Sequence, residues 1–246
     1  MRVRPNAGIT ECPAEGVGLM KREEVRARLE EVGIIPIVRV SSAEEARFAA
    51  ETVGRGGIPV VEIAMTVPGA NEVISRLVRS APEMIVGGGS VLDTDMARLC
   101  VDAGAKFLTS EGFDLEVVEF AVKEGVVVLP GALTPTEVIT AWKAASDFVK
   151  VFPCAQLGGE SYIRALKAAL PQVPLIAAGG VNQETATGFI LAGAAALGVG
   201  RELIPKEAIR QRNPEWIREL AQRFLGLVKN ARSQTAAWKG SVATRK

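Results

Sequence analysis

A lysine and a glutamate each lie inside an apolar run that is typical of a buried strand. Lys150 is flanked by β-branched and aromatic residues in Asp147–Pro153, and Glu62 lies between Val61 and Ile63. A buried ammonium group needs a partner, and desolvation favours the neutral amine, which attacks carbonyl groups. Lys150 is therefore a candidate Schiff-base nucleophile. The alternative is an edge-strand lysine whose ammonium group reaches water.

Glu62 is a candidate proton carrier for the same chemistry. An iminium on Lys150 would accept the electrons of a breaking C–C bond, while Glu62 moved protons during carbinolamine formation and took the proton of the hydroxyl that becomes an aldehyde. A charged glutamate also favours the ammonium form of lysine, so desolvation must offset it or the two groups share a proton. The alternative is a buried Lys–Glu ion pair with a purely structural role.

The composition excludes several other classes of function. The chain has 246 residues, is 48% hydrophobic and carries a net charge of +1, so nothing indicates a nucleic acid or an anionic membrane as a partner. It has no histidine, and its three cysteines, Cys12, Cys100 and Cys154, are scattered. We therefore expect no metal site, no cofactor, no disulfide framework and a cytoplasmic protein that acts on a small molecule.

The fold is predicted from a pattern that repeats along the chain: a short apolar strand, a glycine or polar turn, and an amphipathic helix. Strands buried on both faces are typical of a parallel sheet covered by helices, and eight units fit a (β/α)8 (TIM) barrel in one domain. A doubly wound open sheet is the alternative, but no G-x-G-x-x-G opens the first helix. The expected strands are Ile34–Val40, Pro59–Met65, Met84–Gly88, Lys106–Thr109, Val126–Pro130, Phe148–Phe152, Pro174–Ala178 and Ala195–Val199.

The two ends of the chain lack this pattern. We expect residues 1–19 to be a disordered or extraneous extension, residues 20–228 to form the barrel, and residues 229–246 to be a flexible, polar tail.

Glycines follow several of the expected strands, at the barrel end where active sites lie. Gly179 and Gly180 follow the seventh strand and Gly200 follows the eighth, where backbone N–H groups commonly hold a phosphate. Gly158 and Gly159 follow the lysine strand and are a third candidate set of donors. The alternative for each pair is a tight strand-to-helix turn.

Several of these segments resemble, in order and spacing, the class I 2-keto-3-deoxy-6-phosphogluconate (KDPG) aldolases, which include the 4-hydroxy-2-oxoglutarate aldolases. The resemblance runs from about Lys21 to Leu227. The segments that carry it are Val61-Glu62-Ile63, Gly87-Gly88-Gly89-Ser90-Val91-Leu92, Leu129-Pro130-Gly131, Val149-Lys150-Val151-Phe152-Pro153 and Ala178-Gly179-Gly180-Val181.

The resemblance implies a homotrimer without metal or cofactor that releases pyruvate and glyceraldehyde 3-phosphate, or pyruvate and glyoxylate from 4-hydroxy-2-oxoglutarate. It makes Lys150 the Schiff-base lysine and Glu62 the proton-transfer group. Arg39, Ser90 and the Gly87–Gly89 turn would lie near the pyruvyl portion, and the glycines after the later strands near the phosphate. The implied substrate contacts are Arg39, Gly88, Gly89, Ser90, Glu111, Pro130, Phe152, Gly158, Gly159, Gly179, Gly180, Gly200 and Arg201.

The chain departs from the family pattern in the substrate shell. Thr66 stands where many members have a carboxylate-binding arginine, Ser90 where threonine is usual, Glu111 where proline is usual, Ala178 where threonine is usual, and Arg201 where a small residue is usual. Three interpretations follow: tolerated drift, a changed substrate, or a weakly active paralogue. A carboxylate at position 111 would repel a pyruvyl carboxylate, and Arg201 could bind a phosphate or fill its site, which favours a changed substrate.

Two further hypotheses remain. A phosphosugar isomerase or epimerase on the same barrel would need a pair of bases, and the lack of histidine disfavours it. A non-catalytic barrel that binds a sugar phosphate as a sensor would retain the glycine loops without turnover.

Overall fold

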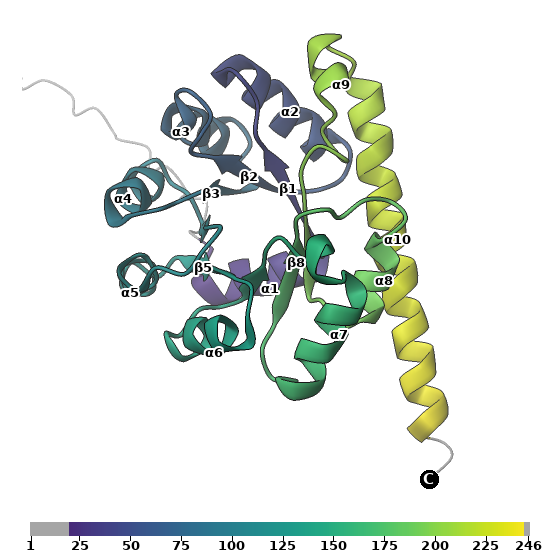
Figure 1. Ribbon diagram of the computed structural model, residues 1–246. Coiled ribbons are helices and arrows are strands. Elements are labelled where there is room, and N and C mark those ends of the chain that lie inside the picture. The colour runs from purple at the N-terminus through teal and green to yellow at the C-terminus, as the bar shows by residue number, and fades with distance from the viewer. Residues whose placement is uncertain (1–19, 244–246) are drawn as a thin grey trace, which may run out of the picture.

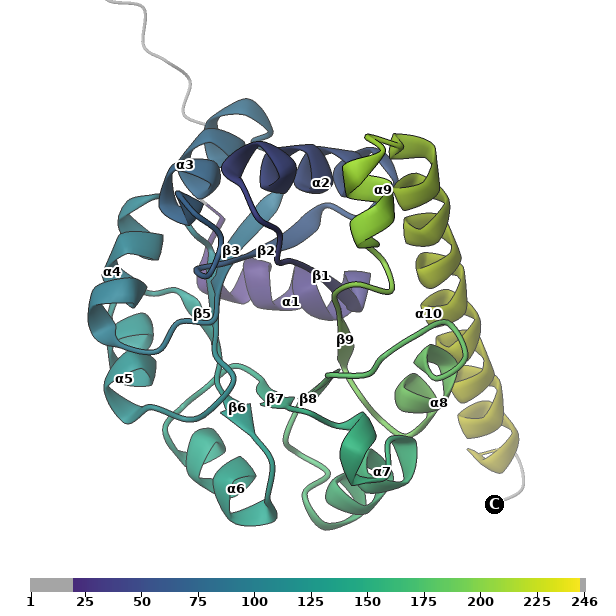
Figure 2. The same cartoon turned by 45° about the horizontal axis from the view of Figure 1, so that its top comes forward.

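All eight predicted strands form, and they lie in chain order around one parallel barrel (Figures 1 and 2). The computed structural model describes residues 20–243, with side chains up to residue 237. The predicted residues 1–19 lie outside the described part. Eight strands become nine because the fifth breaks at Pro130. The strands are β1 (Ile34–Val38), β2 (Val60–Ala64), β3 (Ile85–Gly89), β4 (Phe107–Thr109), β5 (Val127–Leu129), β6 (Gly131–Ala132), β7 (Val149–Val151), β8 (Leu175–Ala178) and β9 (Ala196–Val199).

The barrel closes at the proline break. In the strand order β5-β4-β3-β2-β1-β9-β8-β7-β6, the two end strands are consecutive in the chain and joined by Pro130. Proline has no N–H to donate to a ladder, but its carbonyl accepts from the Lys150 amide at 2.9 Å, and the Val128 carbonyl accepts from the Asp147 amide at 3.1 Å. The ring is therefore continuous through β5, β6 and β7. This confirms the barrel over the doubly wound open sheet.

Helices cover the outside of the barrel (Figure 2). Several begin where a polar side chain accepts a hydrogen bond from the third helical amide, as Ser42, Asp93 and Asp114 do, and Thr134 with Glu137 forms a capping box. The outer helices are α2 (Ala43–Arg55), α3 (Ala70–Ser80), α4 (Thr94–Asp102), α5 (Leu115–Lys123), α6 (Pro135–Lys143), α7 (Glu160–Ala169), α8 (Ala186–Leu191), α9 (Lys206–Arg210) and α10 (Pro214–Ala243), with a short 3₁₀ turn η1 (Ala155–Leu157).

One helix, α1 (Arg22–Val32), lies across the opening at the N-terminal ends of the strands (Figure 2). It contacts β1, β5 and β9. Arg22 pairs with Asp147 at 2.9 Å, and the Arg26 guanidinium lies 5.5 Å from the centroid of the Phe148 ring. This end of the barrel is therefore closed, and the opposite end is left for a ligand.

The predicted boundary at residue 228 is too early. The chain beyond it continues as part of α10, which runs unbroken from Pro214 to Ala243 (Figure 1). Ala231 is fully buried, and Arg232 donates to the carbonyls of Glu31 at 2.6 Å, Glu30 at 2.5 Å and Ala195 at 2.9 Å. A polar segment was mistaken for a tail because its anchor is an arginine that pairs with distant backbone carbonyls. Among the described residues, no helix is both long and apolar enough to cross a membrane.

Candidate active site

Lys150 points into the interior of the barrel. Only 3% of the residue is exposed, and its Nζ lies 3.5 Å from Thr109 Oγ1 and 3.9 Å from Glu111 Oε1. Thr109 ends β4, which is not a neighbour of β7 in the sheet, so this contact crosses the interior. The Phe152 ring centroid lies 5.5 Å from the same Nζ. Lys150 is therefore neither an edge lysine nor one whose ammonium group reaches water.

Glu62 shares this interior and is 1% exposed. Its Oε1 atom is buried and has no hydrogen-bond partner among the described residues. A side chain on Gly89 would collide with the Glu62 carboxylate, so the glycine in β3 provides its space. Burial raises the pKa of Glu62, while Lys150 and the Thr109 hydroxyl oppose the rise. A buried carboxylate oxygen without a partner costs stability, which is typical of a functional group.

Lys150 and Glu62 do not form a direct ion pair. The structural salt bridge considered for this pair is therefore wrong. The two groups are linked through Thr109, whose hydroxyl contacts the lysine and lowers the glutamate pKa. Sequence reasoning missed Thr109. A polar residue at the last position of an otherwise apolar strand, on the same side of the strand as Phe107, was the available signal.

Three groups converge on the carboxylate of Glu111 above Lys150. Its Oε1 accepts from Arg39 Nη2 at 2.8 Å and from Ser90 Oγ at 2.9 Å, and Arg39 Nη2 also donates to Ser90 Oγ at 2.9 Å. Ser90 has a φ of 56°, a left-handed conformation that is costly for a non-glycine residue and turns its hydroxyl into the site. Burial would raise the pKa of Glu111, but Lys150, Ser90 and Arg39 outweigh it, and the pKa is lowered.

The exposure of the side chains increases from Lys150 through Glu111 to Arg39. The Lys150 side chain is 4% exposed, that of Glu111 is 28% exposed and that of Arg39 is 52% exposed. The Arg39–Glu111 pair therefore lies at the mouth of the barrel and Lys150 below it. Arg39 follows β1. Thr66, the position where a family arginine is usual, is exposed in the turn after β2.

Not every predicted site residue joins this cluster. A side chain on Gly88 would meet Cys100 in α4, so Gly88 faces the helical layer rather than the interior, because alternate residues of a strand face opposite sides. Pro130 contributes its carbonyl to the backbone pairing of Lys150. Ala178 is buried at the end of β8.

The glycines predicted to lie near a phosphate are in loops that pack closely against one another. The Gly158 and Gly159 amides donate to the carbonyls of Ala155 and Cys154 at 3.4 and 3.1 Å. These bonds lie within the turn itself, and the contact of Gly158 and Gly159 with a phosphate stays a prediction. A side chain on Gly179 would come within 2.8 Å of Pro153, and one on Gly180 would collide with Ala155. These glycines let the loops after β7 and β8 pack together.

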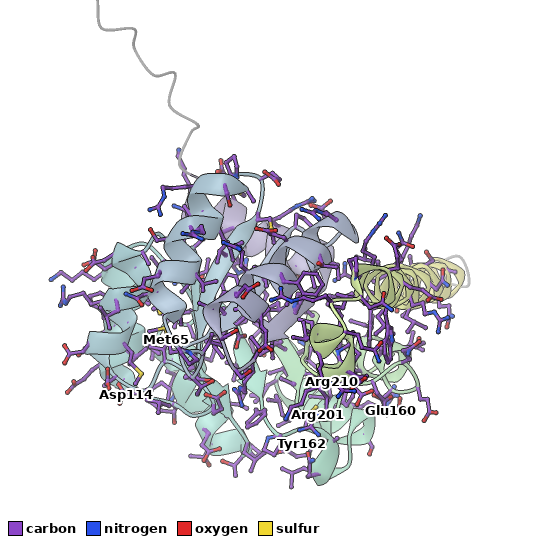
Figure 3. All side chains as sticks on the ribbon, turned by 90° about the horizontal axis from the view of Figure 1, so that it is seen from above. Met65, Asp114, Glu160, Tyr162, Arg201 and Arg210 are labelled. Atoms are coloured by element: carbon purple, nitrogen blue, oxygen red, sulfur yellow. The ribbon has the colours of Figure 1, made fainter. Side chains whose placement is uncertain are left out.

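Gly200 follows β9 and precedes Arg201, which is exposed. Figure 3 shows Arg201 on the same side of the molecule as Glu160 and Tyr162 of α7. The Tyr162 hydroxyl donates to the Leu133 carbonyl and ties α7 to the loop before α6. Arg201 lies beside these loops, and no carboxylate of the described residues forms an ion pair with it.

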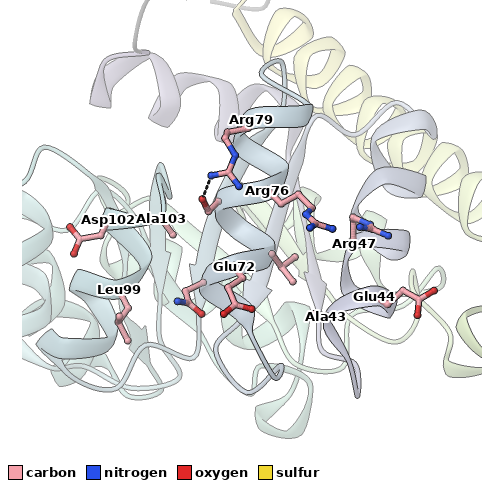
Figure 4. A pocket seen from close by; sticks show the side chains of 12 residues that line it. Ala43, Glu44, Arg47, Glu72, Arg76, Arg79, Leu99, Asp102 and Ala103 are labelled. Atoms are coloured by element: carbon pink, nitrogen blue, oxygen red, sulfur yellow. Dashed lines mark hydrogen bonds between the residues drawn. The ribbon is translucent and has the colours of Figure 1, made fainter.

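A hollow of about 760 Å³ lies elsewhere, on the outer surface between α2, α3 and α4 (Figure 4). Both positively and negatively charged side chains line it, including Arg47, Glu72 and Arg76. In Figure 4 the Arg79 guanidinium turns to Ser75, to which it donates at 2.5 Å. Lys150 is the better candidate for chemistry, because it is the one place in the described part of the chain where a buried amine and an unpartnered buried carboxylate share an interior.

Comparisons with known proteins show to which family the chain is similar. The sequence model of a family described as KDPG and KHG aldolase matches residues 25–220. A 2-dehydro-3-deoxy-phosphogluconate aldolase from Treponema pallidum is 28% identical over 81% of this chain and 95% of its own. A 2-dehydro-3-deoxy-6-phosphogalactonate aldolase from Escherichia coli is 33% identical over 69% of this chain and 83% of its own.

Solved structures show the same similarity. A KDPG aldolase from Legionella pneumophila, with pyruvate captured as a covalent carbinolamine, has a TM-score of 0.75 and 28% identity over 80% of this chain and 96% of its own. A structure described as native KDPGal has a TM-score of 0.75 and 29% identity over 81% of this chain and 96% of its own. The chain belongs to the KDPG and KHG aldolase family of carbon–carbon lyases.

Proposed function

We propose that this protein is a class I aldolase that cleaves 2-dehydro-3-deoxy-6-phosphogluconate to pyruvate and glyceraldehyde 3-phosphate, and 4-hydroxy-2-oxoglutarate to pyruvate and glyoxylate. The observation that carries the proposal is Lys150, 3% exposed inside the barrel, beside a buried Glu62 oxygen without a partner. An amine held away from water and a carboxylate free to exchange a proton are the two groups that Schiff-base cleavage requires.

The proposed reaction begins with attack of the neutral Lys150 amine on the C2 carbonyl of the substrate. The carbinolamine loses water to give an iminium on Nζ. The C3–C4 bond then breaks as Glu62 removes the proton of the C4 hydroxyl, so that the bond electrons enter the iminium and an aldehyde leaves. The remaining enamine takes a proton at C3, and water releases pyruvate and restores the amine. Burial raises the pKa of Glu62, so this carboxyl group holds a proton more readily than an exposed glutamate and can donate as well as accept one.

The distal end of the substrate would lie toward Gly180, Gly200 and Arg201. Arg201 is exposed and has no ion-pair partner among the described residues, so its N–H groups are available for a bidentate contact with a phosphate. A carboxylate would suit it equally well. The curated relatives include both a phosphogluconate and a phosphogalactonate aldolase. Cleavage rates of the two corresponding substrates will show which configuration at C4 this chain prefers.

Reductive trapping tests the proposal directly. Borohydride added with pyruvate is expected to leave a pyruvyl adduct on Lys150, found by peptide mass spectrometry, and Lys150→Arg is expected to show none because arginine cannot form the imine. An adduct on another lysine, or none, would contradict the proposal. Cleavage of a panel of phosphorylated and non-phosphorylated 2-keto acids then ranks the substrates.

The same proposal includes a homotrimer. It is supported by a similar chain, 28% identical with a TM-score of 0.78 over 87% of this chain and 78% of its own, from a protein cage designed by fusing symmetric oligomeric domains. Large exposed apolar residues at the start of α5, on α4 and just before α4 offer a surface to bury: Leu115, Leu99 and Leu92. Light scattering should give three times the 26.0 kDa of one chain. A mass of one chain would contradict this part.

A further inference from the structure

We propose that the Glu111 carboxylate occupies the site that the substrate carboxylate needs. The two carboxylates then compete, and this competition sets how strongly the enzyme binds 2-keto acids. The inference rests on the proposed function, since it assumes that a keto acid forms an imine with Lys150.

The anion site is defined by what surrounds one oxygen atom. Glu111 Oε1 accepts from Arg39 Nη2 at 2.8 Å and Ser90 Oγ at 2.9 Å and lies 3.9 Å from Lys150 Nζ. These three donors follow or belong to β1, β3 and β7, no two of which are neighbours in the sheet. The three donors therefore meet because the closed barrel brings the ends of these strands together around Glu111 Oε1. Two charge-assisted donors and an ammonium group around one oxygen make a site for a carboxylate.

The position of this oxygen matches that of a bound keto acid. In an imine of a 2-keto acid, the carboxylate is attached to the carbon that is bonded to the lysine nitrogen. Ordinary bond lengths then place a carboxylate oxygen about 3 Å from Nζ. Glu111 Oε1 is 3.9 Å from Nζ, within about 1 Å of that separation. The carboxylate of the chain and that of the substrate therefore cannot both occupy the site.

The exchange requires movement of one side chain only. The backbone around Glu111 is held by Ser110 Oγ, which donates to the Gly112 carbonyl at 2.6 Å, and by the Gly131 amide, which donates to the same carbonyl at 3.1 Å. A side chain on Gly131 would collide with the Glu111 backbone, so this loop lies tightly against β6. The Glu111 side chain is 28% exposed and can rotate into water.

This arrangement has a measurable consequence. When the binding-competent state is only a fraction of the population, the apparent dissociation constant rises by the inverse of that fraction. Glu111 keeps most molecules in the occupied state, so a keto acid binds more weakly than its contacts alone would allow. A neutral ketone has no carboxylate to place in the anion site, so its binding is not subject to the same competition.

The test compares pyruvate with acetone as probes of imine formation on the full-length protein. Borohydride trapping at Lys150 is measured over a range of each probe, for the wild type, Glu111→Gln and Glu111→Ala. Glutamine keeps the size of the side chain and removes its charge, and alanine removes any remaining hydrogen bonds. We expect both variants to lower the half-saturating pyruvate concentration by about tenfold or more, with acetone changed by less than about twofold and the maximal trapping rate with pyruvate undiminished.

The half-saturating concentration of pyruvate is divided by that of acetone in each protein. Any effect of the lost charge on the Lys150 amine changes both concentrations alike, so a change in this ratio reports the anion site alone. Glu119→Gln, an exposed glutamate in α5, is the matched control for the change in net charge and should behave as the wild type. Equal shifts for pyruvate and acetone, no shift for either, or a lost maximal rate would overturn the inference while leaving the proposed function intact. The absence of any adduct on Lys150 in all proteins would instead overturn the proposed function and this inference with it.

Discussion

The two ends of the barrel hold charged side chains in opposite ways. At the end closed by α1, both Asp147 oxygens are used: Arg22 donates from Nε at 3.0 Å and from Nη2 at 2.9 Å, and the Val128 amide donates at 2.8 Å. At the open end, Glu62 is more deeply buried, yet no described residue forms a hydrogen bond with its Oε1 atom. Asp147 and Lys150 lie three positions apart in one segment. The satisfied carboxylate stabilises the fold, and the unsatisfied one is available for chemistry.

The largest expected effect is the loss of activity on replacing Lys150 by methionine. Methionine keeps much of the side-chain length but cannot form an imine, so turnover should fall by about 10⁴-fold or more. The melting temperature should stay equal or rise, because a buried amine is replaced by an apolar group. Steady-state pyruvate release and thermal unfolding measure the two quantities. A large drop in melting temperature with activity retained would show that Lys150 stabilises the fold and is not needed for the reaction.

Glu62→Gln should lower turnover by about 10²- to 10⁴-fold, since glutamine cannot accept the hydroxyl proton. In the wild type, activity should fall as the pH drops through the Glu62 pKa, which burial raises above 4.5, because the reaction needs the carboxylate. A profile of turnover against pH should show this acid limb in the wild type and lack it in the variant. A variant as active as the wild type would assign the proton transfer to another group.

Asp147→Ala tests the other end of the barrel. It removes four hydrogen bonds, three from Arg22 and one from the Val128 amide. Among the described residues, this leaves the Arg22 guanidinium with the Ala145 carbonyl at 3.1 Å as its one acceptor, so we expect a loss of about 2–4 kcal/mol in the free energy of unfolding. Turnover of the folded enzyme should be unchanged. Urea unfolding followed by circular dichroism measures the loss. Asp102→Ala, an exposed aspartate in α4, is the matched control and should be neutral.

The smallest expected effect is the pH dependence of stability at Glu62. Because the folded-state pKa lies above the unfolded value near 4.5, the native state binds more protons than the unfolded state between these two values. Stability from this group therefore decreases as the pH rises through that window. The difference in unfolding free energy between Glu62→Gln and the wild type should grow in favour of the variant over the same window and then level off. A constant difference across pH would contradict the raised pKa.

The repeated strand and helix pattern predicted the barrel because each strand is buried on both faces, a property that depends on local sequence. Lys150 and Glu62 were found for the same reason, as charged residues within apolar runs. The extension of α10 past residue 228 was missed because its anchor, Arg232, pairs with carbonyls about 200 positions away along the chain. Thr109 was missed because its role depends on its distance from a strand across the barrel.

Glu111 shows most clearly where sequence reasoning stops. Its identity alone indicated repulsion of a bound carboxylate, and that inference used only the sign of its charge. Its engagement with Arg39 and Ser90 depends on side chains 72 and 21 positions away. The order of residues along this chain was sufficient to predict the barrel and to single out Lys150 and Glu62 as buried charged residues, because burial and periodicity are properties of short segments. Closure of the ring decided which charges are satisfied, because partners from non-neighbouring strands meet only across the interior.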